Sequence, residues 1–422
     1  MKVAIVGLGA SGLMASAIAS KHNEVHIFEK NEKAGKKIFI TGKGRCNMTN
    51  ACDIFEFKNN IVRNSKFLSH ALSVFNNQDI IDFFESNGLK TKVERGNRVY
   101  PKDDKAYLVT DCFMNIIKKN NAKIFFNTEV TEILTNGDKV VGIKVKDSKS
   151  NKINEYSFDK VIVCTGGMSY KSTGSTGDGY RFAKDLDINT TKLYPSLIPF
   201  KVKQNDELKH LEGLNLRNVS IKISNKDNKV LYKDFGEMMF RDSCLDGPII
   251  LSASAYVVDK LDEKLTIHID LKPSLDYQKL EQRILRDVKD NNKYTIKEEL
   301  LSLLPSQMID VFANRVINSL DDSIDLDSVY NKSISNLSKK ERNAIINTLK
   351  DYSFEIIDTK NFDSAIVTKG GIDIKEIDAK TMQSKKINDL YFAGEVMDID
   401  ALTGGFNLSI AFITGYIAGQ LL

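Results

Sequence analysis

Three glycines near the N-terminus have the spacing of a dinucleotide-binding turn. Gly7, Gly9 and Gly12 follow the apolar run Val3–Val6 and open a helical pattern. In such a turn the first glycine permits the tight bend, the second lets the backbone approach a pyrophosphate, and the third allows close helix–strand packing. The free N–H groups at the helix N-terminus favour phosphate. The pattern therefore predicts a nucleotide cofactor here.

A carboxylate at the end of the next strand completes this fingerprint. Glu29 ends the predicted strand Val25–Glu29 and lies about 20 residues after the turn, where an acidic residue can accept hydrogen bonds from the adenosine ribose. Both NAD and FAD carry that ribose, so the fingerprint alone does not separate the two cofactors.

The late part of the sequence favours FAD. Gly394-Glu395 follows a short apolar strand, and Thr403–Asn407 precedes a helix. In flavin enzymes of this fold a late Gly-Glu step meets the ribitol, and the next helix points its N-terminus at the flavin pyrimidine edge. The helix dipole stabilises negative charge there when the flavin is reduced. The alternative is a glycine-rich connection before a terminal helix, without chemistry.

Composition bounds the remaining possibilities. A chain of 422 residues predicts two or three domains. The net charge of +4 neither requires nor excludes an anionic partner. Five scattered cysteines without a CxxC pair argue against disulfides and a metal site, and they fit the cytoplasm. The apolar stretch Phe406–Leu422 is shorter than the roughly 20 residues of a membrane span, so no membrane role is expected.

The elements that must position these residues can be read from periodicity. Helices are predicted over 79–87 and 107–120, and a strand over 123–126. A hairpin is predicted over 129–146 and a buried strand over 160–164.

A β-rich texture follows residue 194, and a helical one runs from Ser274 to Leu349. One buried helix face is predicted from Leu280, Ile284, Leu285 and Val288. A basic surface on this helical region, solvated or facing RNA, is predicted from Lys279, Arg283, Arg286, Lys289, Lys293 and Lys297.

Several longer motifs carry a family resemblance. Gly35–Asn50 resembles the signature of the BaiN/RdsA-type flavoproteins, bacterial proteins also described as NAD(P)/FAD-dependent or aminoacetone-oxidase-like. Matching segments follow in the same order, at Thr165–Tyr170, Gly174–Tyr180, Gly236–Phe240, Gly247-Pro248, Val367–Ile372 and Gly394–Asn407. The resemblance spans nearly the whole chain.

The resemblance implies an α/β fold whose Rossmann-type FAD-binding domain is discontinuous, with an inserted β-rich domain and a small helical domain. The expected segments are residues 1–192 (FAD-binding, first part), 193–273 (β-rich substrate domain, first part), 274–345 (helical insertion), 346–362 (β-rich return) and 363–422 (FAD-binding, second part).

The family's FAD contacts carry over onto matching positions of this chain. These are Gly7, Gly9, Gly12, Glu29, Lys36, Gly44, Arg45, Val130, Gly166, Gly394, Glu395, Asp398 and Asn407. Residues of the same motifs expected to line the cofactor are Ser11, Lys30, Cys46, Thr165, Gly167, Gly404, Gly405, Phe406 and Leu408. Lys36 and Arg45 suit phosphate or flavin oxygens, and a surface role is the alternative for Lys36.

The sequence departs from the family pattern at two places. Arg241-Asp242 stand where relatives usually carry Thr-His, and Lys171-Ser172 stand where they often carry Pro-Lys. The resemblance therefore fixes the cofactor more firmly than the substrate.

The resemblance implies that reduced FAD transfers hydride from N5 to a C=C bond conjugated with a carbonyl, either in uridine of ribosomal RNA or in a steroid-like enone. Only one dinucleotide fingerprint is present, so NAD(P)H is expected to dock transiently as the reductant. The alternatives are a small-molecule enone reductase with an apolar pocket and an amine oxidase that uses O₂. RNA is placed slightly ahead of small molecules.

The proton donor has two candidates. Cys46 lies inside the glycine-rich signature, and Tyr170 ends the Thr165–Tyr170 motif. Each has a plain structural alternative, a small buried thiol for Cys46 and a packed core ring for Tyr170.

Overall fold

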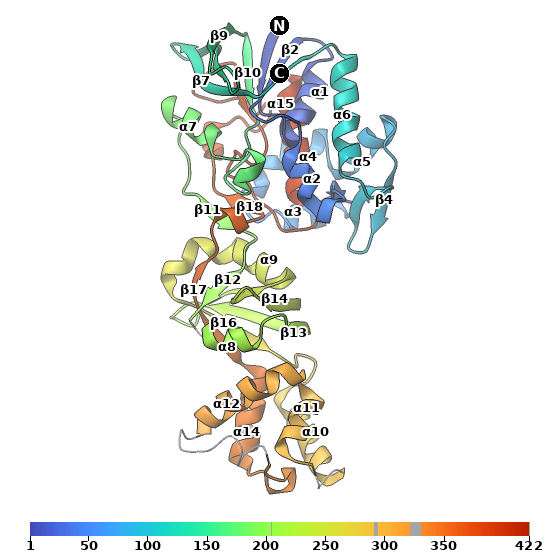
Figure 1. Cartoon of the computed structure of the whole chain (residues 1–422), viewed down its shortest axis with the longest axis vertical. Coiled ribbons are helices and arrows are strands. Elements are labelled where there is room, and N and C mark those ends of the chain that lie inside the picture. Colours follow the sequence, from blue (N-terminus) through green and yellow to red (C-terminus); the bar gives the residue numbers. More distant parts are fainter. Residues whose placement is uncertain (204, 291–293, 321–330, 422) are drawn as a thin grey trace. The chain divides into compact units, whose positions relative to one another are not determined.

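The computed structural model describes residues 1–203, 205–290, 294–320 and 331–421. The chain divides into two compact units (Figure 1). Unit 1 comprises Met1–Leu197 and Asn361–Leu422, and unit 2 comprises Ile198–Lys360. Both chain ends therefore belong to the same unit.

The centre of unit 1 is a five-stranded parallel sheet with the order β19-β10-β1-β2-β6. Its strands are Leu390–Phe392, Lys160–Val163, Lys2–Val6, Glu24–Glu29 and Lys123–Phe126, in that order. The apolar runs of the central strands are buried, as expected for a parallel sheet covered on both faces. The carboxyl ends of β1, β10 and β19 thus meet at one edge.

Two helices from opposite ends of the sequence lie side by side in unit 1. α1 (Ala10–Ala19) begins at the glycine turn, and α15 (Phe406–Gln420) follows the late glycines (Figure 1). A Cβ atom added to Gly415 would lie 2.4 Å from the carbonyl oxygen of Ser11, so the two backbones touch. Small residues permit this contact, which fixes α15 against α1 in unit 1.

The remaining elements of unit 1 surround this centre. The helices are α2 (Lys36–Ile40), α3 (Ile54–Asn59), α4 (Ser69–Val74), α5 (Asn77–Ser86), α6 (Tyr107–Lys119) and α7 (Asp178–Asp185). One antiparallel sheet contains β7 (Thr128–Asn136), β8 (Lys139–Asp147) and β9 (Ile153–Ser157). Another contains β3 (Thr49–Asn50), β5 (Arg98–Pro101) and β4 (Thr91–Glu94), and β11 (Tyr194–Ser196) pairs with β18 (Val367–Lys369). The predicted helices, hairpin and strands before residue 164 are confirmed within two residues.

Unit 2 contains a closed antiparallel barrel with the order β12-β15-β14-β13-β16-β17. The strands are Phe200–Val202, Cys244–Asp246, Val230–Arg241, Asn215–Ser224, Leu265–Asp270 and Tyr352–Thr359, in that order. Its helices are α8 (Asn205–His210), α9 (Pro248–Val257), α10 (Tyr277–Asp290), α11 (Ile296–Leu303), α12 (Ile309–Leu320) and α14 (Lys339–Lys350). The separation of a helical domain at residue 274 stays a prediction.

One expectation for the helical region is wrong. Leu285 is 45% exposed, because its neighbour Ile284 takes the buried position on α10. The basic surface predicted for this region is partly neutralised by ion pairs with neighbouring carboxylates. Arg283 and Arg286 both pair with Asp287, and Lys279 pairs with Asp276. Lys293 lies outside the described residues.

One carboxyl group of the helical region is buried. Glu299 on α11 is 4% exposed, and its Oε1 atom has no hydrogen-bond partner among the described residues. Burial, reinforced by Asp287, raises the pKa of Glu299 to about 7 against the opposing charge of Arg283 and Arg286. Such a group stays largely protonated in slightly acidic solution.

We expect this carboxyl group to make the helical region less stable at alkaline pH. The folded state binds the proton more tightly than the unfolded chain, so stability falls as the pH rises from about 4.5 towards about 7, by up to about 3 kcal/mol. Glu299→Gln should abolish this loss. Hydrogen exchange of α10 and α11, converted to opening free energies at about pH 5 and about pH 8, provides the measurement. If the opening free energies of wild type and Glu299→Gln depend equally on pH, the prediction is wrong.

Candidate functional site

In the glycine turn between β1 and α1, the protein leaves no space for a side chain at Gly7 or Gly12 but leaves space at Gly9. A Cβ atom added to Gly7 would lie 2.7 Å from the Cys164 carbonyl oxygen. One added to Gly12 would lie 1.9 Å from the Gly7 carbonyl oxygen. At Gly9 an added Cβ would have no atom within 4 Å. Gly9 caps α1 without a side-chain hydrogen bond, so the first N–H groups of the helix face this open space. The turn therefore fits a pyrophosphate.

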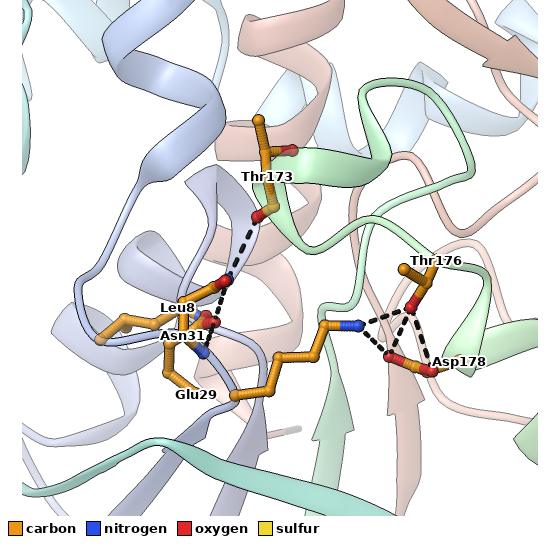
Figure 2. Close-up of polar contacts among 7 residues, drawn as sticks. Leu8, Glu29, Asn31, Thr173, Thr176 and Asp178 are labelled. Carbon is orange, nitrogen blue, oxygen red and sulfur yellow. Dashed lines mark hydrogen bonds and ion pairs between the residues drawn. The ribbon is translucent and has the colours of Figure 1, made fainter. Parts of the chain in front are cut away.

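The carboxylate of Glu29 lies beside this turn (Figure 2). Its Oε2 atom accepts a hydrogen bond from the Leu8 backbone N–H at 2.7 Å. Its Oε1 atom accepts from the backbone and side-chain N–H groups of Asn31, at 2.9 and 2.6 Å. A carboxylate has about four acceptor positions, so Glu29 keeps capacity for a ribose hydroxyl. The network holds the carboxylate in place for that contact.

A loop from later in the sequence closes over the end of β2. The Asn31 amide donates to the Thr173 carbonyl oxygen at 3.1 Å. Figure 2 shows Thr173, Thr176 and Asp178 on one side of this network. Lys30 donates to the Thr176 hydroxyl and to Asp178, both at 2.6 Å. Lys30, a predicted cofactor residue, thus positions the glycine-rich loop 174–180 next to the glycine turn.

The carboxylate of Glu395 accepts hydrogen bonds from segments that are distant in sequence. The Oε1 atom of Glu395 accepts hydrogen bonds from the Ser169 hydroxyl and the Thr368 backbone N–H, both at 2.8 Å. Its Oε2 atom accepts from the Lys37 ammonium at 3.0 Å, and Lys37 also donates to Ser169 at 3.0 Å. Residues following β10, in β18, following β19 and in α2 therefore share one polar cluster, here called the Glu395 cluster.

The Glu395 cluster keeps its carboxylate ionised. Burial alone would raise the pKa of Glu395, but the charge of Lys37 and the hydrogen bonds from Thr368 and Ser169 outweigh burial and lower it. Of the two adjacent lysines, Lys37 contacts Glu395, and the predicted FAD contact of Lys36 stays a prediction. The Lys36 ammonium instead pairs with Glu32 at 2.8 Å, one turn earlier on the surface.

The residues around Gly166 provide a further test of the cofactor. The Thr165 hydroxyl is buried without a hydrogen-bond partner among the described residues. A Cβ at Gly167 would lie 2.5 Å from the Thr368 hydroxyl, and Gly166 has a φ of +70°. Buried polar groups are rarely left unpaired in folded proteins. An orphaned hydroxyl near an open glycine turn fits a polar ligand such as FAD.

The late glycines shape the N-terminus of α15. Gly404 and Gly405 have φ values of +131° and +101°, and a Cβ at Gly405 would lie 2.5 Å from the Thr49 carbonyl oxygen. The Asn407 side chain accepts from the Ala401 N–H at 2.9 Å and donates to the Ala401 carbonyl at 2.7 Å. This closes a loop that presents the helix N-terminus, as the flavin prediction requires.

The other motif residues support these turns. Ser11 packs under Gly394, where an added Cβ would lie 2.5 Å from the Ser11 hydroxyl oxygen. Phe406 is buried against Phe57, with ring centroids 5.3 Å apart, and Leu408 is half-buried. These contacts hold the two chain ends together.

Some predicted cofactor residues already have protein partners. Arg45 donates to both carboxylate oxygens of Glu94, at 2.9 and 3.0 Å, and its guanidinium stacks on Tyr100. Asp398 is 2% exposed and pairs with Arg63 at 2.7 Å.

Val130 and Gly44 lie outside the Glu395 cluster. Val130 is buried in β7, where only its backbone could meet a ligand, and Gly44 is exposed at the segment before Arg45. Their expected FAD contacts therefore stay predictions.

The two proton-donor candidates differ in access. Cys46 is fully buried, and burial raises the pKa of its thiol to about 12 despite a hydrogen bond with Thr41. Tyr170 is half-buried, has a φ of +54°, and directly follows Ser169 of the Glu395 cluster. Tyr170 is thus the more accessible candidate.

Two further features bear on the class of site. Within the described ranges, no group of three or more His, Cys, Asp and Glu side chains is placed to hold a metal ion. Of the helices that the structure describes, none combines the length and apolar character that a membrane span requires.

Comparison with known proteins identifies the family of this chain. The HI0933-like protein Rossmann domain family matches residues 1–421. The chain is 29% identical to the 3-dehydro-bile acid delta(4,6)-reductase of Clostridium scindens, covering 99% of this chain and 98% of that protein. It is 27% identical to the ribosomal RNA dihydrouridine synthase of Haemophilus influenzae, and the match covers 98% of this chain and 96% of that protein.

A solved structure shares the fold. The 3-ketosteroid delta1-dehydrogenase of Sterolibacterium denitrificans matches with a TM-score of 0.51 and 12% identity, over 99% of this chain and 98% of that one. The Rossmann-type α/β fold with an additional β-rich part is thus confirmed. The chain belongs to the HI0933-like family of Rossmann-fold proteins and is a flavin-dependent oxidoreductase.

Proposed function

We propose that this enzyme reduces a C=C bond conjugated with a carbonyl group and that its substrate is uridine in ribosomal RNA. The observation that carries the proposal is the match along nearly the whole chain to two reductases. The names of those relatives denote a bile-acid delta(4,6)-reductase and a ribosomal RNA dihydrouridine synthase. Saturation of an electron-poor C=C bond is the chemistry that the two names share.

The protein's own part in this reaction is to bind, orient and protonate. Bound in its reduced form, FAD supplies the hydride. The turn at Gly9 and the carboxylate of Glu29 would hold the dinucleotide, and the Glu395 cluster would meet the ribitol. Tyr170 would donate a proton to the second carbon of the substrate, because Cys46 has no exposed surface.

The source of reducing equivalents follows from the single dinucleotide fingerprint. NAD(P)H would dock transiently and reduce the flavin, since the sequence contains no second glycine-rich Rossmann turn. A cytoplasmic location would suit an enzyme that uses NAD(P)H and ribosomal RNA.

Charge distribution favours RNA over a small molecule. Unit 1 contains 35 Lys and Arg against 29 Asp and Glu, whereas unit 2 contains 25 against 27. The unit predicted to bind FAD thus carries the positive excess that a polyanionic partner would recognise. The second candidate is a small-molecule enone reductase, favoured by the 29% identity to the bile-acid enzyme.

Mass-spectrometric mapping of dihydrouridine in ribosomal RNA tests the proposal. We expect cells that lack the gene to lose a dihydrouridine, and the wild-type gene to restore it. An unchanged dihydrouridine map after deletion would reject RNA as the substrate. The reduced enzyme would then be tested with steroid-like enones, and its reaction with O₂ would test the amine-oxidase alternative.

A further inference from the structure

A hairpin of unit 1 carries cations without carboxylate partners. The turn between β4 and β5 contains Arg95, Gly96 and Asn97, and Arg98 begins β5. Arg95 and Arg98 are both exposed, and neither has an ion-pair partner among the residues that the structure describes. Lys43, in the segment before Arg45, is also exposed and unpaired within the same described part.

Two cations near the hairpin are neutralised by carboxylates. Arg45 pairs with Glu94, and Lys92 pairs with Asp104 at 2.6 Å. Glu94 is the last residue of β4 and lies opposite Arg98 in the β4–β5 register. Between residues 90 and 105 the sequence has six Lys and Arg against three Asp and Glu. Two of these six cations, Arg95 and Arg98, lie at the turn.

One side chain connects this hairpin with the turn before α15. The Asn50 amide donates to the Gly96 carbonyl oxygen at 3.1 Å and to the Gly404 carbonyl oxygen at 3.0 Å. Asn50 is also paired with Arg98 across β3 and β5. A single amide thus separates the cationic hairpin from the glycines predicted to face the pyrimidine edge of the flavin.

An exposed aromatic ring lies close to the same hairpin. Phe55 at the start of α3 is 73% exposed. The backbone N–H of Ala51 donates to the Asn97 carbonyl oxygen at 2.7 Å, and Phe55, four residues later in the chain, lies within about 14 Å of Ala51. An exposed ring beside unpaired cations suits single-stranded RNA, whose bases stack on aromatic side chains while its phosphates meet cations.

We propose that Arg95, Arg98, Lys43 and Phe55 form a docking surface for a single-stranded segment of ribosomal RNA, which it guides to the flavin. The three cations contact phosphates and Phe55 stacks on a base. This inference rests on the proposed function and names the surface that such a substrate would use. The helical region is the competing surface, but its Lys279, Arg283 and Arg286 already have carboxylate partners.

The test compares two variants that each lose two exposed cations. R95A/R98A removes the hairpin charges, and R286A/K289A removes two exposed charges from α10 as the matched control. The probe is ribosomal RNA from cells that lack the gene, titrated against each FAD-loaded protein at several salt concentrations. FAD content, thermal unfolding and NAD(P)H-driven flavin reduction show whether each variant is folded and loaded.

We expect R95A/R98A to bind the RNA at least about tenfold more weakly, with a salt dependence shallower by about 1.4 in logarithmic slope, since each single-strand phosphate contact contributes about 0.7. R95K/R98K should recover most of the affinity, and R286A/K289A should bind as wild type. Dihydrouridine formation should fall with affinity, while flavin reduction stays unchanged.

Two outcomes would overturn the inference in different ways. If wild type modifies the RNA and R95A/R98A binds and modifies it equally well, the hairpin is not the docking surface, although the proposed function stands. If the wild-type enzyme neither binds nor modifies the RNA, the proposed function fails and the docking surface fails with it.

Discussion

Replacing Gly12 with alanine will give a protein that folds poorly and carries no FAD. The added Cβ would lie 1.9 Å from the carbonyl oxygen of Gly7 and 3.3 Å from the Cys164 side chain. The nearer of these two atoms belongs to the backbone and cannot rotate away, so α1 must move away from β1 to make room for the methyl group. Overpacking of a core usually costs about 1–3 kcal/mol, and we expect at least the upper end here. Thermal unfolding and flavin absorbance of the purified protein measure both effects.

Gly9→Ala is the matched control because it adds the same methyl group where the protein leaves space. No atom lies within 4 Å of the added Cβ, so the variant should fold as well as wild type. Its methyl group would occupy the approach of the pyrophosphate, and FAD affinity should fall at least about tenfold, or about 1.4 kcal/mol. A Gly9→Ala protein with wild-type FAD affinity would show that the dinucleotide does not bind at this turn.

Lys37→Met will destabilise unit 1 and weaken FAD binding. Lys37 supplies the charge that lowers the pKa of Glu395, and its loss leaves that carboxylate among Ser169 and Thr368 without a cation. Removing one partner of a buried pair costs about 3–5 kcal/mol. The Lys37 and Glu395 side chains are 24% and 20% exposed, so about 2 kcal/mol is the better expectation.

A double-mutant cycle tests this pair. The pKa of Glu395 is lowered in the folded protein, so its stabilising effect is full above the ordinary carboxyl pKa and is lost as the pH falls through the lowered value. Lys37→Met should reduce that acid sensitivity, and K37M/E395Q should lose less stability than the sum of the single changes. Additive losses at neutral pH would mean that the two side chains do not interact. Lys36→Met, which breaks the pair with Glu32, serves as the control for stability alone.

Features encoded by local chemistry could be predicted from the sequence. The strand–glycine–helix unit at Gly7–Gly12 and the turn at Gly404–Gly405 each need backbone geometry that glycine supplies, so their residues are visible without a structure. The role proposed for Glu29 could be predicted because this acidic residue lies at the end of β2. The strand β6 was predicted with its observed limits, because its apolar run is bounded by polar residues.

Features set by helix phase or distant contacts could not be predicted. Lys36 and Lys37 differ by about 100° around α2, and only the packing of that short helix decides which one meets Glu395. Helix phase also decides that Ile284 is buried and the neighbouring Leu285 is exposed, against the prediction that both are buried. The Ser169 and Thr368 bonds to Glu395 join segments separated by more than 20 residues, and nothing local announces them.

The discontinuous unit 1 has a consequence for synthesis on the ribosome. Strand β10 pairs with β1 on one side and with β19 on the other, and α15 covers α1. Residues 198–360, which form unit 2, leave the ribosome before residues 361–422. Until then β10 has an open edge that can pair with other chains. Unit 2 can therefore fold first, while the nascent nucleotide-binding unit depends on chaperones or rapid completion to protect that edge.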